Sequence, residues 1–140
     1  MRSYAYARRL HWSECDPGGI IFFPNYARWM VDGLNEMLLS LGIDPNEARG
    51  GNERGGLPVL GLSMKFHKAP ALHEQITHRI AVEKLGGKSI GFQHQFLRGD
   101  DLLMEAQETR VWANHLLGDP RSLRTLPIPD DVRAVLERND

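Results

Sequence analysis

A carboxylate, a rigid turn and a helix start follow one another between residues 14 and 26. Asp16 precedes Pro17 and two glycines, and Pro24 comes shortly after. Proline fixes φ and glycine permits positive φ, so residues 16–19 are expected to form a tight turn. The first N–H groups of a helix have no partners within the helix and carry partial positive charge. A carboxylate beside such donors could attack a carbonyl or activate water while the amides hold a developing oxyanion, which is acyl-transfer chemistry.

The same residues also fit a purely structural role. Aspartate is common before Pro-Gly, because its side chain accepts hydrogen bonds from the backbone N–H groups that follow. Spacing alone therefore leaves both interpretations of Asp16 open.

The elements that would position this carboxylate can be predicted from hydrophobic periodicity. Apolar residues recur at three- and four-residue steps after Pro24, and Gly42 suits a helix end, which predicts a helix over residues 24–41. Looser alternation before the turn predicts a first strand over residues 4–14.

Four further strands are expected after a loop over residues 44–56 that is rich in glycine, asparagine and charge. The candidate strands span residues 57–68, 73–85, 88–99 and 103–117. Glycine-containing connections at 86–87 and 99–101 predict hairpins, and Asp130 and Asp131 are expected to cap a short final helix. One helix covering a five-stranded antiparallel meander gives a two-layer α+β fold in one domain, residues 1–140.

Composition excludes several classes of function. The net charge of −1 argues against a general nucleic-acid binder. The single cysteine excludes an intrachain disulfide, and there is no apolar leader and no run of about 20 apolar residues, so we expect a cytoplasmic protein without a membrane segment. The six histidines show no paired metal-binding spacing, so no metal is expected. No dinucleotide, nucleotide-triphosphate or hydrolase-elbow motif occurs.

The run Asp-Pro-Gly-Gly-Ile-Ile-Phe-Phe-Pro-Asn-Tyr, residues 16–26, followed by Arg28-Trp29, resembles the 4-hydroxybenzoyl-CoA thioesterase family. It is also similar to acyl-CoA thioesterases associated with the Tol–Pal system. Weaker matches follow at residues 52–55, 87–89 and 108–112. The resemblance implies a hotdog fold, a five-stranded antiparallel sheet wrapped around one long central helix. It further implies hydrolysis of an acyl-CoA thioester with no cofactor, since coenzyme A is part of the substrate.

By this resemblance Asp16 is the catalytic carboxylate, acting as nucleophile or general base, and the backbone N–H of Phe23 polarises the carbonyl. Relatives usually carry Tyr or His at or next to Phe23, so this chain lacks a polar side chain there. Lys88 and Ser89 match a hairpin that contacts CoA, and Glu53 is either a structural loop residue or an aid to water activation. The predicted substrate-binding residues are Pro17, Gly19, Asn25, Tyr26, Arg54, His67, Lys88 and Ser89.

Two alternative functions are considered beside the thioesterase, and an oligomeric assembly is also predicted. A non-catalytic acyl-CoA or acyl-carrier binding module could share the fold, because folds host many functions. A hotdog dehydratase would need a catalytic histidine near the helix, and residues 16–29 contain none. Exposed sheet edges favour self-association. The resemblance implies a homodimer, further paired into a homotetramer, with Asp16 of one chain facing glycine- and serine-bearing segments of the other.

Overall fold

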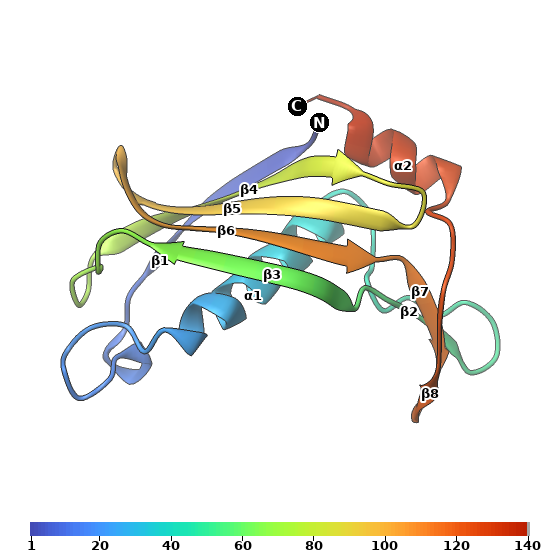
Figure 1. Ribbon diagram of the computed structural model, residues 1–140, viewed down its shortest axis with the longest axis horizontal. Coiled ribbons are helices and arrows are strands. Elements are labelled where there is room, and N and C mark those ends of the chain that lie inside the picture. Colours follow the sequence, from blue (N-terminus) through green and yellow to red (C-terminus); the bar gives the residue numbers. More distant parts are fainter. Residues whose placement is uncertain (140) are drawn as a thin grey trace.

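A long helix lies across one face of an antiparallel sheet in the computed structural model, which describes residues 1–139 (Figure 1). The elements are β1 Ser3–Arg9, a 3-10 turn Trp12–Glu14, α1 Pro24–Ser40, β2 Glu53–Gly56, β3 Val59–Phe66, β4 Gln75–Leu85, β5 Ser89–Arg98, β6 Asp101–Val111, β7 Ala113–Leu116, β8 Asp119–Thr125 and α2 Asp130–Glu137. Neither helix is long and apolar enough to cross a bilayer.

The main sheet has five strands in the order β1-β4-β5-β6-β3, and all its pairings are antiparallel. The predicted five-stranded sheet around one long helix is therefore confirmed. The simple meander is wrong for β3, because residues 67–74 carry the chain from the edge beside β6 to β4. Strands β1 and β3 are consequently the two edges of the sheet, and α1 crosses its face between them (Figure 1).

Several predicted boundaries are also wrong, each for a local reason. The first strand ends at Arg9, since residues 12–14 turn back on themselves through a hydrogen bond from the Glu14 N–H to the His11 carbonyl. The predicted strand 103–117 breaks at Trp112, where the chain leaves the main sheet for a small one ordered β2-β7-β8. Both β2 and β8 were missed. Asp130 and Asp131 lie inside the first turn of α2, whose N-cap is Pro129.

Helix α1 confirms the predicted apolar face. It buries seven residues against the sheet: Tyr26, Trp29, Met30, Gly33, Leu34, Met37 and Leu38. Its N-terminal half packs with Leu10, Phe96 and Met104, and its C-terminal half belongs to a second cluster. The helix therefore spans two hydrophobic clusters, which fixes its direction over the sheet.

A chain of polar groups crosses the inner face of the sheet beneath α1. Tyr6 Oη lies 2.7 Å from His78 Nδ1, and His78 Nε2 lies 2.9 Å from His94 Nδ1. His94 Nε2 lies 3.1 Å from Glu108 Oε2, and Arg110 pairs with the other oxygen of that carboxylate. Both histidines and Glu108 are buried. Four strands thus contribute to one polar chain in an otherwise apolar layer.

These distances are compatible with one arrangement of protons, in which His94 Nε2 faces Glu108 at ion-pair distance but without a recorded hydrogen bond within residues 1–139. The Tyr6 hydroxyl donates to His78 Nδ1, His78 Nε2–H donates to His94 Nδ1, and His94 Nε2–H faces an ionised Glu108. Burial by itself would raise the pKa of Glu108, but hydrogen bonds from His94 and Arg110 bring it below its ordinary value. In this arrangement His78 Nε2 is the donor to His94, and burial keeps the His78 ring neutral.

Helix α1 comes very close to this chain at Gly33. A Cβ atom added there would lie 2.7 Å from both His78 Nδ1 and Tyr6 Oη. Real Cβ atoms do not approach other atoms so closely, so only glycine fits without moving the helix or the side chains below it.

The buried chain makes stability depend on pH. Burial lowers the pKa of His78 from 6.5 to about 2, so the folded chain keeps this ring neutral while the unfolded chain binds a proton below pH 6.5. The His78 contribution is therefore complete above pH 6.5 and is lost as pH falls toward 2, at about 1.4 kcal/mol per pH unit. Urea denaturation between pH 6.5 and 5 should show this slope, and His78→Gln should flatten it.

Only the slope is compared, because His78→Gln also removes partners from its neighbours and lowers stability at every pH. His115→Gln, a change at a partly exposed histidine, is the matched control and should keep the wild-type slope. Equal slopes in wild type and His78→Gln would contradict the neutral buried ring.

Candidate active site

The loop before α1 is built as two short arms that pair with each other. The Asp16 N–H donates to the Ile20 carbonyl at 2.8 Å, and Cys15 and Ile21 form an antiparallel bridge. The Phe22 N–H then donates to the Glu14 carbonyl at 2.9 Å. The loop therefore returns to the place where it began, next to the first turn of the helix.

Asp16 lies at the tip of the first arm and is partly exposed. Its Oδ1 accepts a hydrogen bond from the Gly18 N–H at 2.8 Å, and within residues 1–139 no partner is recorded for Oδ2. A Cβ on Gly18 would lie 3.1 Å from Oδ1, and Gly19 has a φ of +84°. The predicted glycine-dependent turn is confirmed, and it leaves one carboxylate oxygen available.

Phe23 ends the second arm and occupies the N-cap of α1 with helical angles, φ −55° and ψ −31°. The N–H groups of Asn25 and Tyr26 donate to the carbonyls of Phe22 and Phe23, at 2.9 and 3.0 Å. In the described part of the chain, no acceptor is recorded for the Phe23 N–H. This donor stands at the positive end of the helix, where an oxygen of a ligand could bind.

An apolar pocket of about 370 Å³ lies beside this helix start. The residues that line it are Ile20, Ile21, Phe23, Tyr26, Phe66, His67, Lys68 and Ala69. Tyr26 is buried, and burial raises the pKa of its hydroxyl to about 12, so it carries no charge there. Phe23 and Phe66 meet edge to face with ring centroids 6.3 Å apart. Asp16 is not part of the lining, but the second arm of its loop is.

The polar side chains at the rim are already paired. His67 Nε2 lies 2.9 Å from Glu105 Oε2, and Lys68 Nζ donates to Asp101 Oδ1 at 2.7 Å. These contacts neutralise the rim and leave an apolar interior. Of the sequence-predicted residues, the structure therefore places Tyr26 in the wall of the pocket and His67 at its rim.

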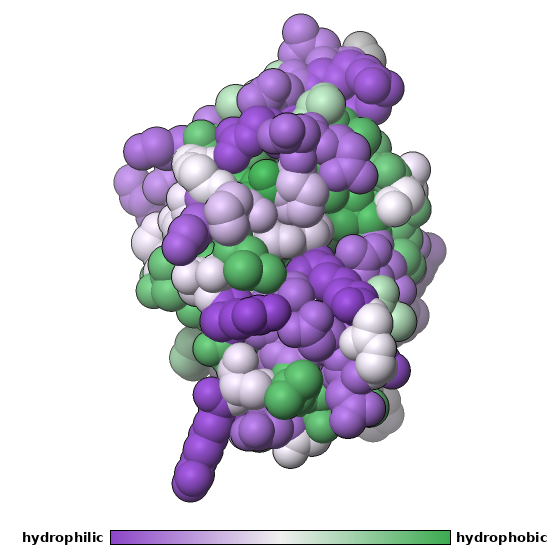
Figure 2. Space-filling model, turned by 90° about the vertical axis from the view of Figure 1, so that its right-hand side faces the viewer, coloured by the Kyte–Doolittle hydropathy of each residue, from purple (hydrophilic) through white to green (hydrophobic). Residues whose placement is uncertain are grey.

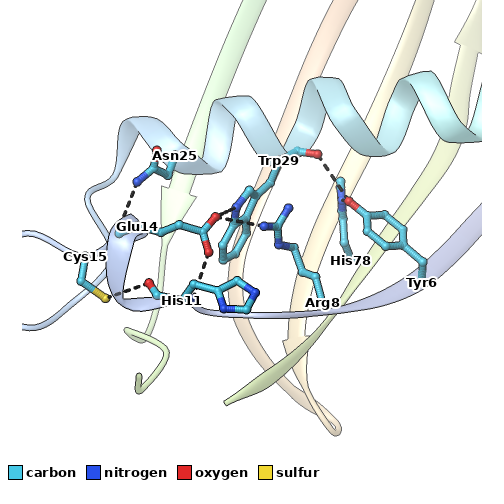
Figure 3. Close-up of polar contacts among 8 residues, drawn as sticks. All are labelled: Tyr6, Arg8, His11, Glu14, Cys15, Asn25, Trp29 and His78. Atoms are coloured by element: carbon cyan, nitrogen blue, oxygen red, sulfur yellow. Dashed lines mark hydrogen bonds and ion pairs between the residues drawn. The ribbon is translucent and has the colours of Figure 1, made fainter. Parts of the chain in front are cut away.

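Glu14 is a residue of this region that the sequence prediction missed (Figure 3). Its carboxylate accepts hydrogen bonds from Trp29 Nε1 at 2.5 Å, Arg8 Nη2 at 2.9 Å and the His11 N–H at 3.0 Å. Asn25 Nδ2 donates to its carbonyl at 2.8 Å, so Asn25 does tie the helix start to the loop. No sequence signal marked this residue, because residue 11 is a histidine and not one of the usual N-cap residues.

Pro17 and Gly19 lie in the turn directly after Asp16, but three other predicted residues lie elsewhere. Lys88 and Ser89 sit at the β4–β5 connection and Arg54 sits on β2, at the end of the sheet away from the start of α1 (Figure 1). The Lys88 side chain is exposed, and no ion pair is recorded for it among residues 1–139. Glu53 pairs with Arg124 at 2.8 Å, which favours the structural role over water activation. Within a single chain, Lys88, Ser89 and Arg54 therefore do not lie near Asp16.

The two ends of the molecule differ in polarity. The end that carries the β4–β5 connection and the small sheet is mostly hydrophilic, with isolated apolar side chains (Figure 2). The opposite end holds the apolar pocket with Phe23 and Phe66. No group of three or more histidine, cysteine or acidic side chains that could hold a metal ion occurs in the described residues. The site consists of a carboxylate, a free amide and an apolar pocket.

Comparisons with known proteins agree with this geometry. A family model described as the thioesterase-like superfamily matches residues 10–136. The 4-hydroxybenzoyl-CoA thioesterase of Pseudomonas sp. strain CBS-3 is 30% identical over 137 residues, which cover 93% of this chain and 94% of that protein.

Solved structures share the fold. An aspartate-to-asparagine variant of 4-hydroxybenzoyl-CoA thioesterase, in complex with 4-hydroxybenzoyl-CoA, aligns with a TM-score of 0.80 at 23% identity over 97% of this chain and 99% of that one. A gentisyl-coenzyme A thioesterase aligns with a TM-score of 0.79 at 24% identity over 96% and 100% of the two chains. A 1,4-dihydroxy-2-naphthoyl-CoA thioesterase from Synechocystis aligns with a TM-score of 0.76 at 14% identity over 96% of both.

The family match covers nearly the whole chain, and the sequence identity to a curated relative extends over the same region. The solved structures show that the fold is shared. The resemblance expected from residues 16–26 is thus confirmed, and the chain belongs to the thioesterase-like superfamily.

Proposed function

We propose that this protein hydrolyses an acyl-CoA thioester to the free acid and CoA, with Asp16 as the catalytic carboxylate and the Phe23 N–H as the donor that polarises the carbonyl. The observation that carries the proposal is the loop before α1. Its two paired arms present an unpaired carboxylate oxygen and an unpaired helix-start N–H to the same neighbourhood, beside an apolar pocket.

The chemistry needs only these groups and water. As general base, Asp16 takes a proton from water while the water oxygen attacks the carbonyl carbon. As nucleophile, its carboxylate oxygen attacks the carbon and water then hydrolyses the anhydride. In both routes the Phe23 N–H stabilises the oxyanion, the C–S bond breaks, and the CoA sulfur leaves and takes up a proton. No cofactor or metal takes part in either route.

The pocket supports an aromatic acyl group. Its volume of about 370 Å³ and its wall of Phe23, Tyr26 and Phe66 suit a flat ring, because aromatic side chains pack against rings edge to face or offset. The relatives named above act on 4-hydroxybenzoyl, gentisyl and dihydroxynaphthoyl esters of CoA, which are all aromatic.

The proposed active unit is a homodimer joined through β3. This edge strand exposes Leu60, Leu62 and Phe66, and an apolar unpaired edge is a surface for another strand. A two-fold axis would turn the second strand end for end. The start of α1 in one copy would then approach the β4–β5 connection of the other, which brings Lys88 and Ser89 to the nucleotide of the substrate. Pairing of two such dimers would give the homotetramer.

Asp16→Asn should lower kcat by at least about 100-fold, the lower range for loss of a general base. Asparagine can still accept the Gly18 N–H bond, so the turn should persist. Release of free thiol from benzoyl, phenylacetyl and straight-chain CoA esters measures the effect. Asp100→Asn, a change at an exposed hairpin carboxylate, is the matched control and should leave kcat unchanged.

Near-normal turnover by Asp16→Asn would remove this carboxylate from the mechanism. A wild-type chain that binds CoA esters in calorimetry but releases thiol from none of them would establish the non-catalytic binding module instead.

Charged residues on the β3 edge should break the dimer. Leu60→Lys with Leu62→Lys places two like charges opposite each other across a two-fold strand pair, which disfavours association. Sedimentation equilibrium at micromolar concentration should show a dimer or a tetramer for the wild type, and half that mass or less with little activity for the variant. Leu123→Lys on β8, at a similarly exposed leucine, should keep the wild-type mass. A monomeric, active wild type would overturn the shared site.

Subunit mixing should show that the site uses residues from both copies. Asp16→Asn and Lys88→Glu should each be poorly active alone. After unfolding and refolding together in equal amounts, half of the dimers are mixed and each mixed dimer has one intact site. Activity should recover to about a quarter of the wild-type value. No recovery from well-folded mixed dimers would place Lys88 and Asp16 of one chain in the same site or remove Lys88 from it.

A further inference from the structure

Glu14 is engaged by more elements than any other charged residue near the loop. The three donors to its carboxylate come from β1, from α1 and from the 3-10 turn, namely Arg8, Trp29 and the His11 N–H. The side chain has only 16% of its surface exposed. Three donors on two carboxylate oxygens hold this side chain more firmly than a typical surface ion pair would.

The cationic partner depends on this anchor. The Arg8 guanidinium stacks over the Trp29 ring, with Cζ 4.0 Å from the ring centroid. Its Nε atom is buried without an acceptor within residues 1–139, and no other ion pair of Arg8 is recorded there. Glu14 therefore balances a partly buried positive charge and at the same time joins β1 to α1 through the loop.

The backbone of the same residue closes the loop. The Glu14 carbonyl accepts both the Phe22 N–H at 2.9 Å and Asn25 Nδ2 at 2.8 Å. Asp16 lies two residues after Glu14, and the Phe23 N–H lies one residue after Phe22. Glu14 thus lies at the origin of the arm that carries Asp16, and its carbonyl holds the end of the arm that leads to the Phe23 N–H.

We propose that Glu14 is the positioning residue of the active site, which holds Asp16 and the Phe23 N–H at the mutual distance that attack on a thioester requires. This inference rests on the proposed function. Glu14 touches no reacting atom, and it acts through the loop. A misplacement of catalytic groups by about 1 Å can lower turnover about 100-fold, whereas binding of the substrate depends on other contacts.

Glu14→Gln is the informative change because it keeps the shape of the side chain. All three partners are donors, and glutamine offers them one oxygen and one NH₂ group. One donor must therefore face another donor, and the anchor loosens. We expect kcat to fall about 10- to 100-fold with KM within about threefold of wild type.

The only cysteine of the chain gives a second readout that does not depend on turnover. Cys15 lies between Glu14 and Asp16, is partly buried, and its Sγ lies 3.6 Å from the His11 carbonyl. If Glu14 orders this arm, alkylation of Cys15 in the folded protein should be about tenfold faster in Glu14→Gln, since local opening controls access to the thiol. Mass spectrometry measures the rate, and circular dichroism establishes that the variant is folded.

Glu36→Gln on the exposed face of α1 is the matched control and should change neither kcat nor the alkylation rate. Trp29→Phe is the second variant, should Glu14→Gln not fold. It keeps an aromatic ring but removes the Nε1–H donor to Glu14, so both effects should appear in the same direction.

A folded Glu14→Gln with wild-type kcat would overturn this inference alone, even if Cys15 became more reactive, because loop order would then not set the rate. A fall in kcat with unchanged Cys15 reactivity would also contradict it, since Glu14 would not act through the loop. A wild-type chain that hydrolyses no CoA ester would instead overturn the proposed function.

Discussion

The unpaired N–H at the start of α1 is the constraint on which the rest of the structure depends. A helix leaves its first amides without internal partners, and here neither a capping side chain nor the preceding loop supplies one to Phe23. Pro24 has no N–H, so the donor of Phe23 stands alone at the positive end of the helix. In the proposed site, this donor, the Asp16 carboxylate and the apolar pocket would act together on the thioester. A site of this kind keeps its polar groups fixed before any substrate arrives, which is the general requirement for stabilising a developing oxyanion.

The sheet supports this arrangement by holding the helix from below. Two apolar clusters take the two halves of α1, and between them the buried chain from Tyr6 to Glu108 meets the helix at Gly33. Buried polar groups specify geometry better than apolar contacts, because each donor must meet its acceptor. The chain adds directional contacts to the core, and its single carboxylate, Glu108, is paired with Arg110. The buried polar chain therefore helps to fix the position of α1, and with it the position of the amide at the start of the helix.

Sequence reasoning succeeded where the signal was local. The three- and four-residue period after Pro24 predicted α1 nearly to the residue, and proline with two glycines predicted the turn at Asp16.

Sequence reasoning failed where the partners of a residue or strand are distant in sequence. Strand β2 has only four residues and β8 is exposed at almost every position, so neither shows alternation. The place of β3 beside β6 depends on non-local pairing. Glu14 was missed because its partners come from β1 and α1, and periodicity does not indicate which residues of two elements will meet. Lys88 was matched to a CoA-contacting hairpin, but sequence order alone did not reveal that this hairpin lies at the far end of the sheet.

Gly33 has a consequence for how this chain can vary. Glycine at this position lets the helix pack directly against the side chains of His78 and Tyr6. This close contact opposes a shift of α1 along its own axis. Gly33 lies about 15 Å along the helix from Phe23, at 1.5 Å per residue. Because a helix is stiff, a displacement of α1 at Gly33 would also move the start of the helix. If the Phe23 N–H binds a carbonyl oxygen as proposed, a methyl group at position 33 would displace that donor from a point in the middle of the sheet.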